Sequence, residues 1–305
     1  MTYFDRASVR PLELDPEILG RSFNHEPFGF RHNLSGLDIF QPGALESLAG
    51  KYSGHAGDYS LASGATAPGQ RFRSVQPVAF GITDAFAQLK ERPVRILLKR
   101  LENYDPRFRE LRDSIIETVV GQLGGLKNDK IVRLFSSVFI SSAKTLTPFH
   151  FDPSMTFFFQ ISGDKRYHVF PPAALNEPEV EQFYCRQAID IAQVDLARRD
   201  PGQEHVYDLA AGKGFHQPQN APHWVETREE LSVSYTISFD TVETRRLGRT
   251  RGFNHYLRSL GMKPAAPGMH PRLDAFKASA LGPFIPLRKL VRDVRSTVKS
   301  AVAAR

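Results

Sequence analysis

The feature that most constrains the fold is a strictly alternating stretch near the middle of the C-terminal half. In LSVSYTISF, the apolar residues 233, 235, 237 and 239 alternate with the Ser and Thr residues 232, 234, 236 and 238. Successive side chains of a β-strand point to opposite faces, so this stretch predicts a strand with one apolar and one polar face. Such a strand is typical of an antiparallel sandwich or barrel.

Other short β-rich segments lie upstream of this strand, and turns that contain Gly, Pro or Asp separate them. This texture begins at Ile131 and predicts a mainly β core with helical additions, an α+β chain. The segments are IVRLFSSVFIS, MTFFFQIS, KRYHVFPP and GFHQPQ.

Helix signals occur on the N-terminal side of the β-rich region. The pattern predicts a short helix at Ala44 to Ala49, a second helix capped by Thr83 or Asp84, and a third with Asp105 as N-cap. Residues 94–102, VRILLKRLE, fit a strand or a helix. The rest of the first 76 residues is rich in Gly, Pro and polar residues and indicates an irregular wrap.

The C-terminal segment is helical and basic. Residues 241–305 carry fourteen Lys and Arg against three Asp and Glu, whereas the preceding residues have a slight acidic excess. The pattern predicts a short helix over 251–261 and an amphipathic helix over 286–303. We favour packing on the barrel or pairing with a second copy in a homodimer, over an anionic membrane surface or nucleic acid. The predicted domains are 1–92, 93–240 and 241–305.

Composition limits the kinds of metal site that the chain can form. Cys185 is the only cysteine, so a metal site must use imidazole and carboxylate ligands, and a reducing compartment is expected. The content of 41% hydrophobic residues is sufficient for a sizeable core. We expect a cytoplasmic protein, because no apolar run approaches the roughly 18 residues of a membrane span.

Candidate metal ligands occur in two separated stretches. His150 and Asp152 lie two residues apart, so on one strand both side chains point to the same side. His223 follows 71 residues after Asp152 and directly precedes the alternating strand. Two imidazoles and one carboxylate on one side of an ion form the facial triad of non-haem Fe(II) oxygenases, which leaves positions open for a keto acid and O₂.

A keto acid with a distal carboxylate also needs a cation inside the barrel, and Lys165 follows the turn SGD at the start of a strand. With period two, Lys165, Tyr167 and Val169 share one face of this strand. Thr156 and Phe158 share a face of the preceding strand with Gln160, so Phe158 is a candidate for the wall of a cofactor pocket.

The order of these motifs resembles a known family. T-P-x-H-x-D is followed by T-F-F-F-Q-I-x-G-x-K, then F-P-P, then P-x-x-x-x-H and a Ser/Thr-alternating strand. This order, from about Arg133 to Asp240, is similar to that of the JmjC-type, cupin-like hydroxylases related to the factor-inhibiting-HIF asparaginyl hydroxylase family. The resemblance implies a double-stranded β-helix, a jelly-roll barrel, with N- and C-terminal helices.

The resemblance also implies a cofactor, a co-substrate and roles for individual residues. His150, Asp152 and His223 would hold Fe(II), and Lys165 and Thr147 would hold the distal carboxylate of 2-oxoglutarate. Thr156, where relatives often have Asn, and Ser238 would lie near the carboxylates of 2-oxoglutarate. The implied reaction is dioxygenase hydroxylation of a C–H bond in a protein side chain or small molecule, with release of succinate and CO₂.

Other interpretations remain at this point. The chain could be a cupin that binds a metal or ligand without redox chemistry, or a nucleic-acid- or chromatin-associated modifying enzyme that the basic segment recruits. Lys165 alone could be a solvated turn residue, His216 is expected to be a hydrogen-bonded rather than a ligating histidine, and Trp224 fits either core or pocket wall. The run 157–159, FFF, is expected to fill the space between two sheets. Two departures from the family pattern, Gly212-Lys213 and residues 220–222, indicate a different substrate pocket.

Overall fold

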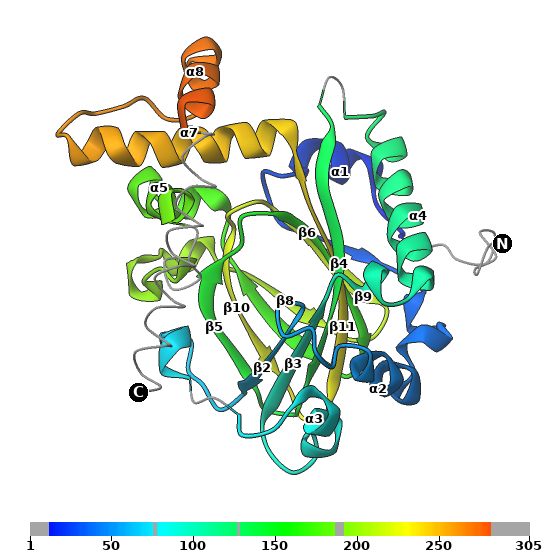
Figure 1. Cartoon of the computed structure of the whole chain (residues 1–305). Coiled ribbons are helices and arrows are strands. Elements are labelled where there is room, and N and C mark those ends of the chain that lie inside the picture. Colours follow the sequence, from blue (N-terminus) through cyan, green and yellow to red (C-terminus); the bar gives the residue numbers. More distant parts are fainter. Residues whose placement is uncertain (1–11, 76–77, 127–128, 187–191, 282–305) are drawn as a thin grey trace. The chain divides into compact units, whose positions relative to one another are not determined.

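The alternating segment is the central strand of a seven-stranded antiparallel sheet in the computed structural model (Figure 1). The structure describes residues 12–75, 78–126, 129–186 and 192–281. Strand β11 (Ser232–Thr241) lies between β4 (Ile131–Ser141) and β6 (Met155–Ser162).

Two sheets form the barrel. The order of the large sheet is β1-β9-β6-β11-β4-β3-β2, and the order of the small sheet is β5-β10-β7-β8. All of their strand pairs are antiparallel. The predicted jelly-roll fold with added helices is therefore confirmed. The remaining strands are β1 (Phe28–Arg31), β2 (Tyr59–Ser63), β3 (Val94–Lys99), β5 (Leu146–Phe151), β7 (Lys165–Val169), β8 (His205–Leu209), β9 (Lys213–Gln217) and β10 (Pro222–Thr227).

The apolar face of the large sheet packs against helices and not against the small sheet. Tyr235 and Ile237 of β11 and Phe157 and Phe159 of β6 belong to one buried cluster with side chains of the helices. Figure 1 shows α2 and α4 on one side of the large sheet and β5 and β10 of the small sheet on the other. The prediction that the run 157–159 fills the space between the sheets is thus wrong for two of its three residues, and only Phe158 packs there.

Of the helices that the sequence predicted on the N-terminal side, α4 begins at the expected residue. Helix α4 (Pro106–Gln122) has Asp105 as N-cap, whose carboxylate accepts a hydrogen bond from the backbone N–H of Arg107. Helix α3 (Ile82–Gln88) is capped by Gly81 without a side-chain bond, so the predicted Thr83 or Asp84 cap is wrong. The other helices are α1 (Pro16–Ser22) and α2 (Pro42–Gly50), which contains the predicted segment 44–49.

The N-terminal segment takes part in the large sheet. Its strands β1 and β2 form the two edges of that sheet, paired with β9 and β3. Strand β3 settles the open choice for 94–102: Val94–Lys99 is extended, and the chain then turns into a short 3₁₀ helix. The 3₁₀ helices of the structure are Leu34–Gly36, Asp38–Phe40, Phe72–Ser74, Leu101–Asn103, Pro172–Ala174, Leu196–Arg198 and Pro201–Gln203.

The chain divides into two compact units. The first, Met1–Leu175 with Ala192–Thr241, holds both sheets; in the second, Asn176–Ile191 with Val242–Arg305, the described residues form helices and the loops between them. The domain boundaries at 92 and 240 stay a prediction.

Three helices form the described part of the second unit. They are α5 (Glu177–Arg186), α7 (Val242–Ser259) and α8 (Pro271–Leu281), and α7 extends the predicted helix over 251–261 toward the N-terminus. Arg251 and Arg258 of α7 pair with Glu177 and Glu181 of α5 at 3.0 and 2.7 Å. The predicted amphipathic helix over 286–303 lies outside the described residues. No helix in the described ranges combines the length and apolarity needed to cross a membrane.

Candidate metal centre

Strand pairing brings the two separated histidines together. His150 of β5 and His223 of β10 are direct partners in the antiparallel register of the small sheet. Opposite residues in such a pair have neighbouring side chains, and the centroids of the two imidazole rings lie 4.3 Å apart. Asp152 follows the last residue of β5, so the same strand supplies the carboxylate.

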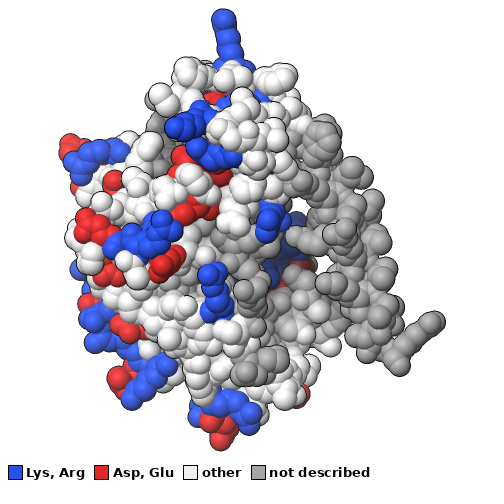
Figure 2. Space-filling model, turned by 90° about the vertical axis from the view of Figure 1, so that its left-hand side faces the viewer, with Lys and Arg blue, Asp and Glu red and all other residues white. Residues whose placement is uncertain are grey.

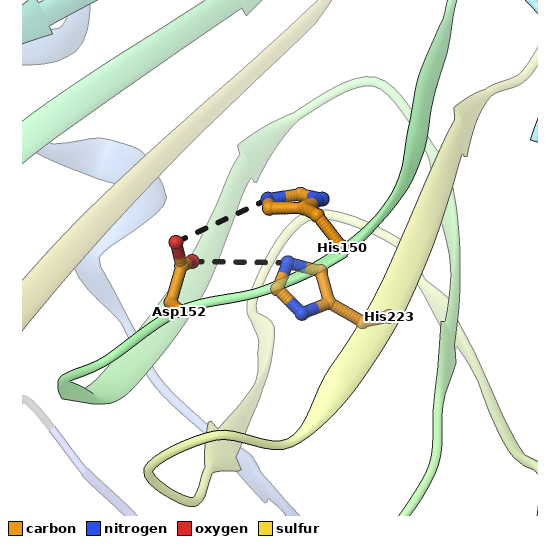
Figure 3. Close-up of side chains that lie close together, drawn as sticks. All are labelled: His150, Asp152 and His223. Carbon is orange, nitrogen blue, oxygen red and sulfur yellow. Dashed lines mark ion pairs between the residues drawn. The ribbon is translucent and has the colours of Figure 1, made fainter. Parts of the chain in front are cut away.

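The three side chains converge on one point, as Figure 3 shows. The Nε2 atom of His223 lies 3.8 Å from Asp152 Oδ2, and that of His150 lies 4.0 Å from Asp152 Oδ1. One ligand atom from each residue lies within 4.8 Å of the other two. An ion that sits about 2.0–2.2 Å from each of two donors can bridge about 4.4 Å between them. The carboxylate-to-imidazole separations therefore suit one bound ion.

Backbone carbonyls orient both imidazoles for metal binding. The Nδ1 atom of His150 lies 2.8 Å from the carbonyl of Pro148, and that of His223 lies 3.0 Å from the carbonyl of Ala221. A carbonyl only accepts, so each Nδ1 carries the proton and each Nε2 offers a lone pair toward Asp152. Burial, and next the nearness of His150, lower the pKa of His223 to about 3, which keeps it a neutral ligand.

The carboxylate marks the open side of the centre. The Asp152 side chain is 42% exposed, whereas the side chains of His150 and His223 are 10% and 3% exposed. The backbone N–H of Asn220 donates to the carbonyl of Asp152 at 2.8 Å, which ties the residue after β5 to the turn before β10. Phe72 lies near His150, with the rings edge to face at 5.1 Å.

A cavity of about 90 Å³ lies inside the barrel, and all eight site residues that the sequence predicted line it. Five further lining residues were not among them. A period of two from Lys165, His223 and Ser238 leads to Tyr167, Val225 and Thr236. Phe139 and Gln217 carry no sequence signal of their own, because strand pairing alone brings β4 and β9 to this place. The predicted residues are Thr147, His150, Asp152, Thr156, Phe158, Lys165, His223 and Ser238.

Lys165 is buried inside the barrel and is not a solvated turn residue. It is the first residue of β7, is 4% exposed, and its Nζ lies 5.7 and 5.8 Å from the ring centroids of Phe139 and Phe158. Within the described ranges no carboxylate pairs with it. Burial, with a smaller contribution from Arg95, lowers the pKa of Lys165 to about 7. A buried cation without a counter-charge is costly, so its position indicates that an anion binds here.

Two hydroxyls face the same cavity from neighbouring strands of the large sheet. Thr156 of β6 and Ser238 of β11 are register partners, and their oxygens lie 2.9 Å apart. One hydroxyl donates to the other, so one proton of the pair remains for a ligand.

His216 and Trp224, whose roles the sequence left open, do not line the cavity. His216 is fully buried on the helix side of the large sheet among Phe23, Phe28 and Phe157, and its Nε2 accepts a hydrogen bond from the backbone N–H of Asn24 at 3.1 Å. Trp224 stacks on His168 with the ring centroids 3.7 Å apart and does not line the cavity. The ligand role considered for His216 is thus excluded by its position.

A jelly-roll barrel with two imidazoles and a carboxylate converging in its interior defines the cupin type of protein. The family model described as "Cupin-like domain" matches residues 83–242, more than half of the chain. This chain belongs to that cupin-like family.

Solved structures show the same fold. The ribosomal oxygenase YcfD from Escherichia coli in complex with cobalt and 2-oxoglutarate is 20% identical, with a TM-score of 0.52 over 90% of this chain and 67% of that chain. Another YcfD structure gives 19% identity and a TM-score of 0.50 over the same shares. HSPB1-associated protein 1 from Rattus norvegicus is 27% identical over 146 residues, which are 45% of this chain and only 30% of that relative.

Proposed function

We propose that this protein is an Fe(II)- and 2-oxoglutarate-dependent oxygenase that hydroxylates a C–H bond of a protein side chain or small molecule. One observation carries the proposal: the buried ammonium of Lys165, without a counter-charge among the described residues, lines the same cavity as His150, Asp152 and His223. A metal triad next to a receptor for an anion fits a co-substrate that chelates the ion and carries a second carboxylate. We further propose a cytoplasmic location and a homodimer.

The donor set fits Fe(II). Two neutral imidazoles and one carboxylate on one side of an ion leave three positions for other ligands, as in the non-haem iron oxygenases. When bound, Fe(II) supplies the redox chemistry by which 2-oxoglutarate is decarboxylated to succinate and CO₂ while a substrate C–H bond is hydroxylated. The carboxylate of Asp152 offsets one of the two positive charges of the ion.

The other cavity residues bind and orient the co-substrate. Lys165 attracts the distal carboxylate as a point charge, and the Thr147 hydroxyl donates a hydrogen bond to the same group. Thr156 and Ser238 provide a hydroxyl donor for the carboxylate nearer to the metal. Phe139, Phe158 and Tyr167 exclude water from the interior, which strengthens these electrostatic contacts.

The likeness to YcfD supports this assignment, because the structure with cobalt and 2-oxoglutarate shares the fold of this chain over 90% of its length. The substrate would approach from the exposed side of Asp152, past Phe72. Gln193 holds the segment that contains Phe72. Its Oε1 accepts a hydrogen bond from the backbone N–H of Phe72 at 2.6 Å, and its Nε2 donates to the carbonyl of Gln70 at 2.9 Å.

The two alternative functions explain less. A cupin that binds a metal without redox chemistry does not by itself account for the buried ammonium of Lys165 beside the three candidate ligands. A nucleic-acid role predicts a broad basic surface; on the one face that Figure 2 shows, the Lys and Arg side chains of the described residues are interspersed with Asp and Glu, so this face does not support that role. Elsewhere among the described residues, Arg166 and Arg228 both contact Asp208, which offsets part of their charge.

A binding experiment without oxygen tests the proposal. Anaerobic addition of Fe(II) and then 2-oxoglutarate to the purified protein should produce a visible charge-transfer absorption, and admission of O₂ should release succinate. Lys165→Met should weaken both signals, while Lys213→Met, an exposed lysine outside the cavity, should leave them unchanged. A protein that binds Fe(II) but gives neither absorption nor succinate would be a non-redox cupin instead.

A further inference from the structure

A second cation, Arg95 of β3, contacts Thr147, which lines the same cavity as Lys165. The Arg95 side chain is half-buried, and its positive charge adds to burial in lowering the pKa of Lys165. Burial also lowers the pKa of Arg95 itself to about 10. Among the described residues no carboxylate pairs with either cation, so neither positive charge is offset by an ion pair there.

Arg95 is bound to the hydroxyl that should meet the co-substrate. Its Nη1 donates to Thr147 Oγ1 at 2.8 Å, and its Nη2 lies 3.4 Å from the carbonyl of Ser63 at the end of β2. Its Nε is buried without a partner. Because the Thr147 oxygen already accepts from Arg95, its own proton is free to point into the cavity that Thr147 lines with Lys165.

We propose that Arg95 is a positioning residue of a carboxylate receptor: it holds the Thr147 hydroxyl toward the cavity and adds a second positive charge behind Lys165. The receptor selects a dicarboxylate whose distal carboxylate meets the ammonium and the hydroxyl together. This inference rests on the proposed function for the identity of the co-substrate. The receptor itself follows from the side chains alone.

The pair of cations predicts a distinctive pH dependence. The titratable groups that line the cavity with Lys165 are Tyr167, His150, His223 and Asp152, and Arg95 lies behind Thr147. In the ligand-free protein the pKa of Lys165 is about 7, so above this pH the neutral lysine must take up a proton when a carboxylate binds. The affinity should therefore fall as the pH rises above about 7. Removal of the Arg95 charge should move this fall to higher pH.

The test measures binding of 2-oxoglutarate and of glutarate to the metal-free protein in EDTA, by calorimetry and thermal unfolding from pH 6 to 9. Arg95→Met should raise the Kd by about tenfold to a hundredfold and shift the fall in affinity to higher pH. Arg95→Lys should raise the Kd but keep the pH of the fall, because the charge stays while the geometry at Thr147 is lost. Lys99→Met, which removes a charge from the same face of β3 outside the cavity lining, should bind as the wild type does.

A double variant tests whether Arg95 affects dicarboxylate binding through Thr147. If Arg95 acts through Thr147, the double variant Arg95→Met/Thr147→Val should bind more tightly than the two single losses would predict together. Unfolding without ligand shows whether each variant folds. If Arg95→Met does not fold, Arg95→Lys and Thr147→Val decide the question.

The outcomes separate the receptor from the oxygenase. Wild-type affinity in Arg95→Met, together with lost affinity in Lys165→Met, would overturn the role of Arg95 and leave the oxygenase intact. Arg95-dependent binding of glutarate without succinate release from 2-oxoglutarate would support the receptor and contradict the oxygenase. Absence of dicarboxylate binding by the wild type would overturn both.

Discussion

The two faces of the large sheet differ although the same strands form them. On the helix side, Tyr235 and Phe159 pack in a continuous apolar core. On the barrel side, Thr236, Ser238 and Phe158, which alternate with the core residues along β11 and β6, line the cavity of the candidate metal centre. Alternate residues of one strand thus serve either the stability of the core or the chemistry of the cavity. Substitutions at adjacent positions should therefore affect either stability or activity.

The barrel side keeps a smaller apolar cluster of its own. It surrounds the rings of Tyr167 and Phe215, whose centroids lie 4.3 Å apart, and leaves the cavity open beside it. The helix side thus carries most of the burial, and the barrel side can hold charged and hydroxyl groups at a tolerable cost in stability. The members of the smaller cluster are Phe158, Tyr167, Val169, Leu209, Phe215, Ala221 and Val225.

The largest expected effect is loss of turnover from the barrel side without loss of the fold. His150→Ala removes one of two imidazole donors, so iron retention should fall and succinate release should drop by about a thousandfold or more. Metal analysis and succinate assays measure this. His168→Ala is the matched control, because that histidine stacks on Trp224 outside the cavity. Equal turnover in the two variants would contradict the metal site.

The opposite result is expected on the helix side. Phe159→Ala should lower the free energy of unfolding by about 3–5 kcal/mol, because it opens a hole in the fully buried core. Succinate release by the protein that remains folded should change little. Phe158→Ala, one residue away, should cost less stability because its ring borders an existing cavity, and should raise the 2-oxoglutarate requirement. Denaturant unfolding and kinetics of both variants would show whether the two faces of the strand separately control stability and the 2-oxoglutarate requirement.

The alternating pattern predicted which residues share a face of the strand, but not which of the two faces lies toward the barrel interior. Residues 232–239 indicated one apolar and one polar face, and the H-x-D spacing with His223 and Lys165 gave the candidate site. An alternating Ser and Thr face usually meets water; here it faces the barrel interior, because helices contributed by distant segments cover the apolar face. That choice depends on tertiary packing, which a local pattern does not contain.

Tertiary packing also explains why the sequence did not indicate a role for Arg95 or Gln217. Arg95 lies in a segment that fitted a strand or a helix, so its side chain could not be assigned to a face until β3 was seen paired with β2 and β4. Gln217 reaches the cavity through the pairing of β9 with β6, and its neighbour His216 points to the helix side. Strand pairing over long sequence distances, which sets both positions, leaves no signal in either segment.

Lys165→Met should reverse the usual relation between burial and stability. The variant should need about a hundredfold more 2-oxoglutarate, because a buried charge contact is lost. Without ligand it should be more stable than the wild type at neutral pH, since a buried unpaired ammonium is replaced by an apolar chain of similar length. Unfolding with and without 2-oxoglutarate measures both effects. A less stable ligand-free variant would show that Lys165 supports the fold.

The same lysine gives the wild type a pH-dependent stability. Its pKa is about 7 in the folded protein and about 10.4 in an unfolded chain, so unfolding takes up a proton between these values. Raising the pH from 7 to 10 therefore disfavours unfolding, and the ligand-free wild type should gain stability over this range. Lys165→Met should lose this gain. Isothermal denaturation at several pH values measures the difference, and an equal gain in both proteins would assign it to other groups.

The smallest effect is expected for the hydroxyl pair on the barrel side. Thr156→Val leaves Ser238 without its partner and should cost about 1 kcal/mol of stability, whereas Thr156→Val with Ser238→Ala removes both groups and should be closer to neutral. The double variant should nevertheless raise the 2-oxoglutarate requirement a few-fold, because no hydroxyl remains for the carboxylate near the metal. Denaturation and succinate kinetics measure the two effects separately. If the double variant kept both its stability and its 2-oxoglutarate requirement, the polar character of this part of the barrel side would serve neither the fold nor the ligand. Loss of stability alone would instead make the pair part of the sheet's packing, as on the helix side.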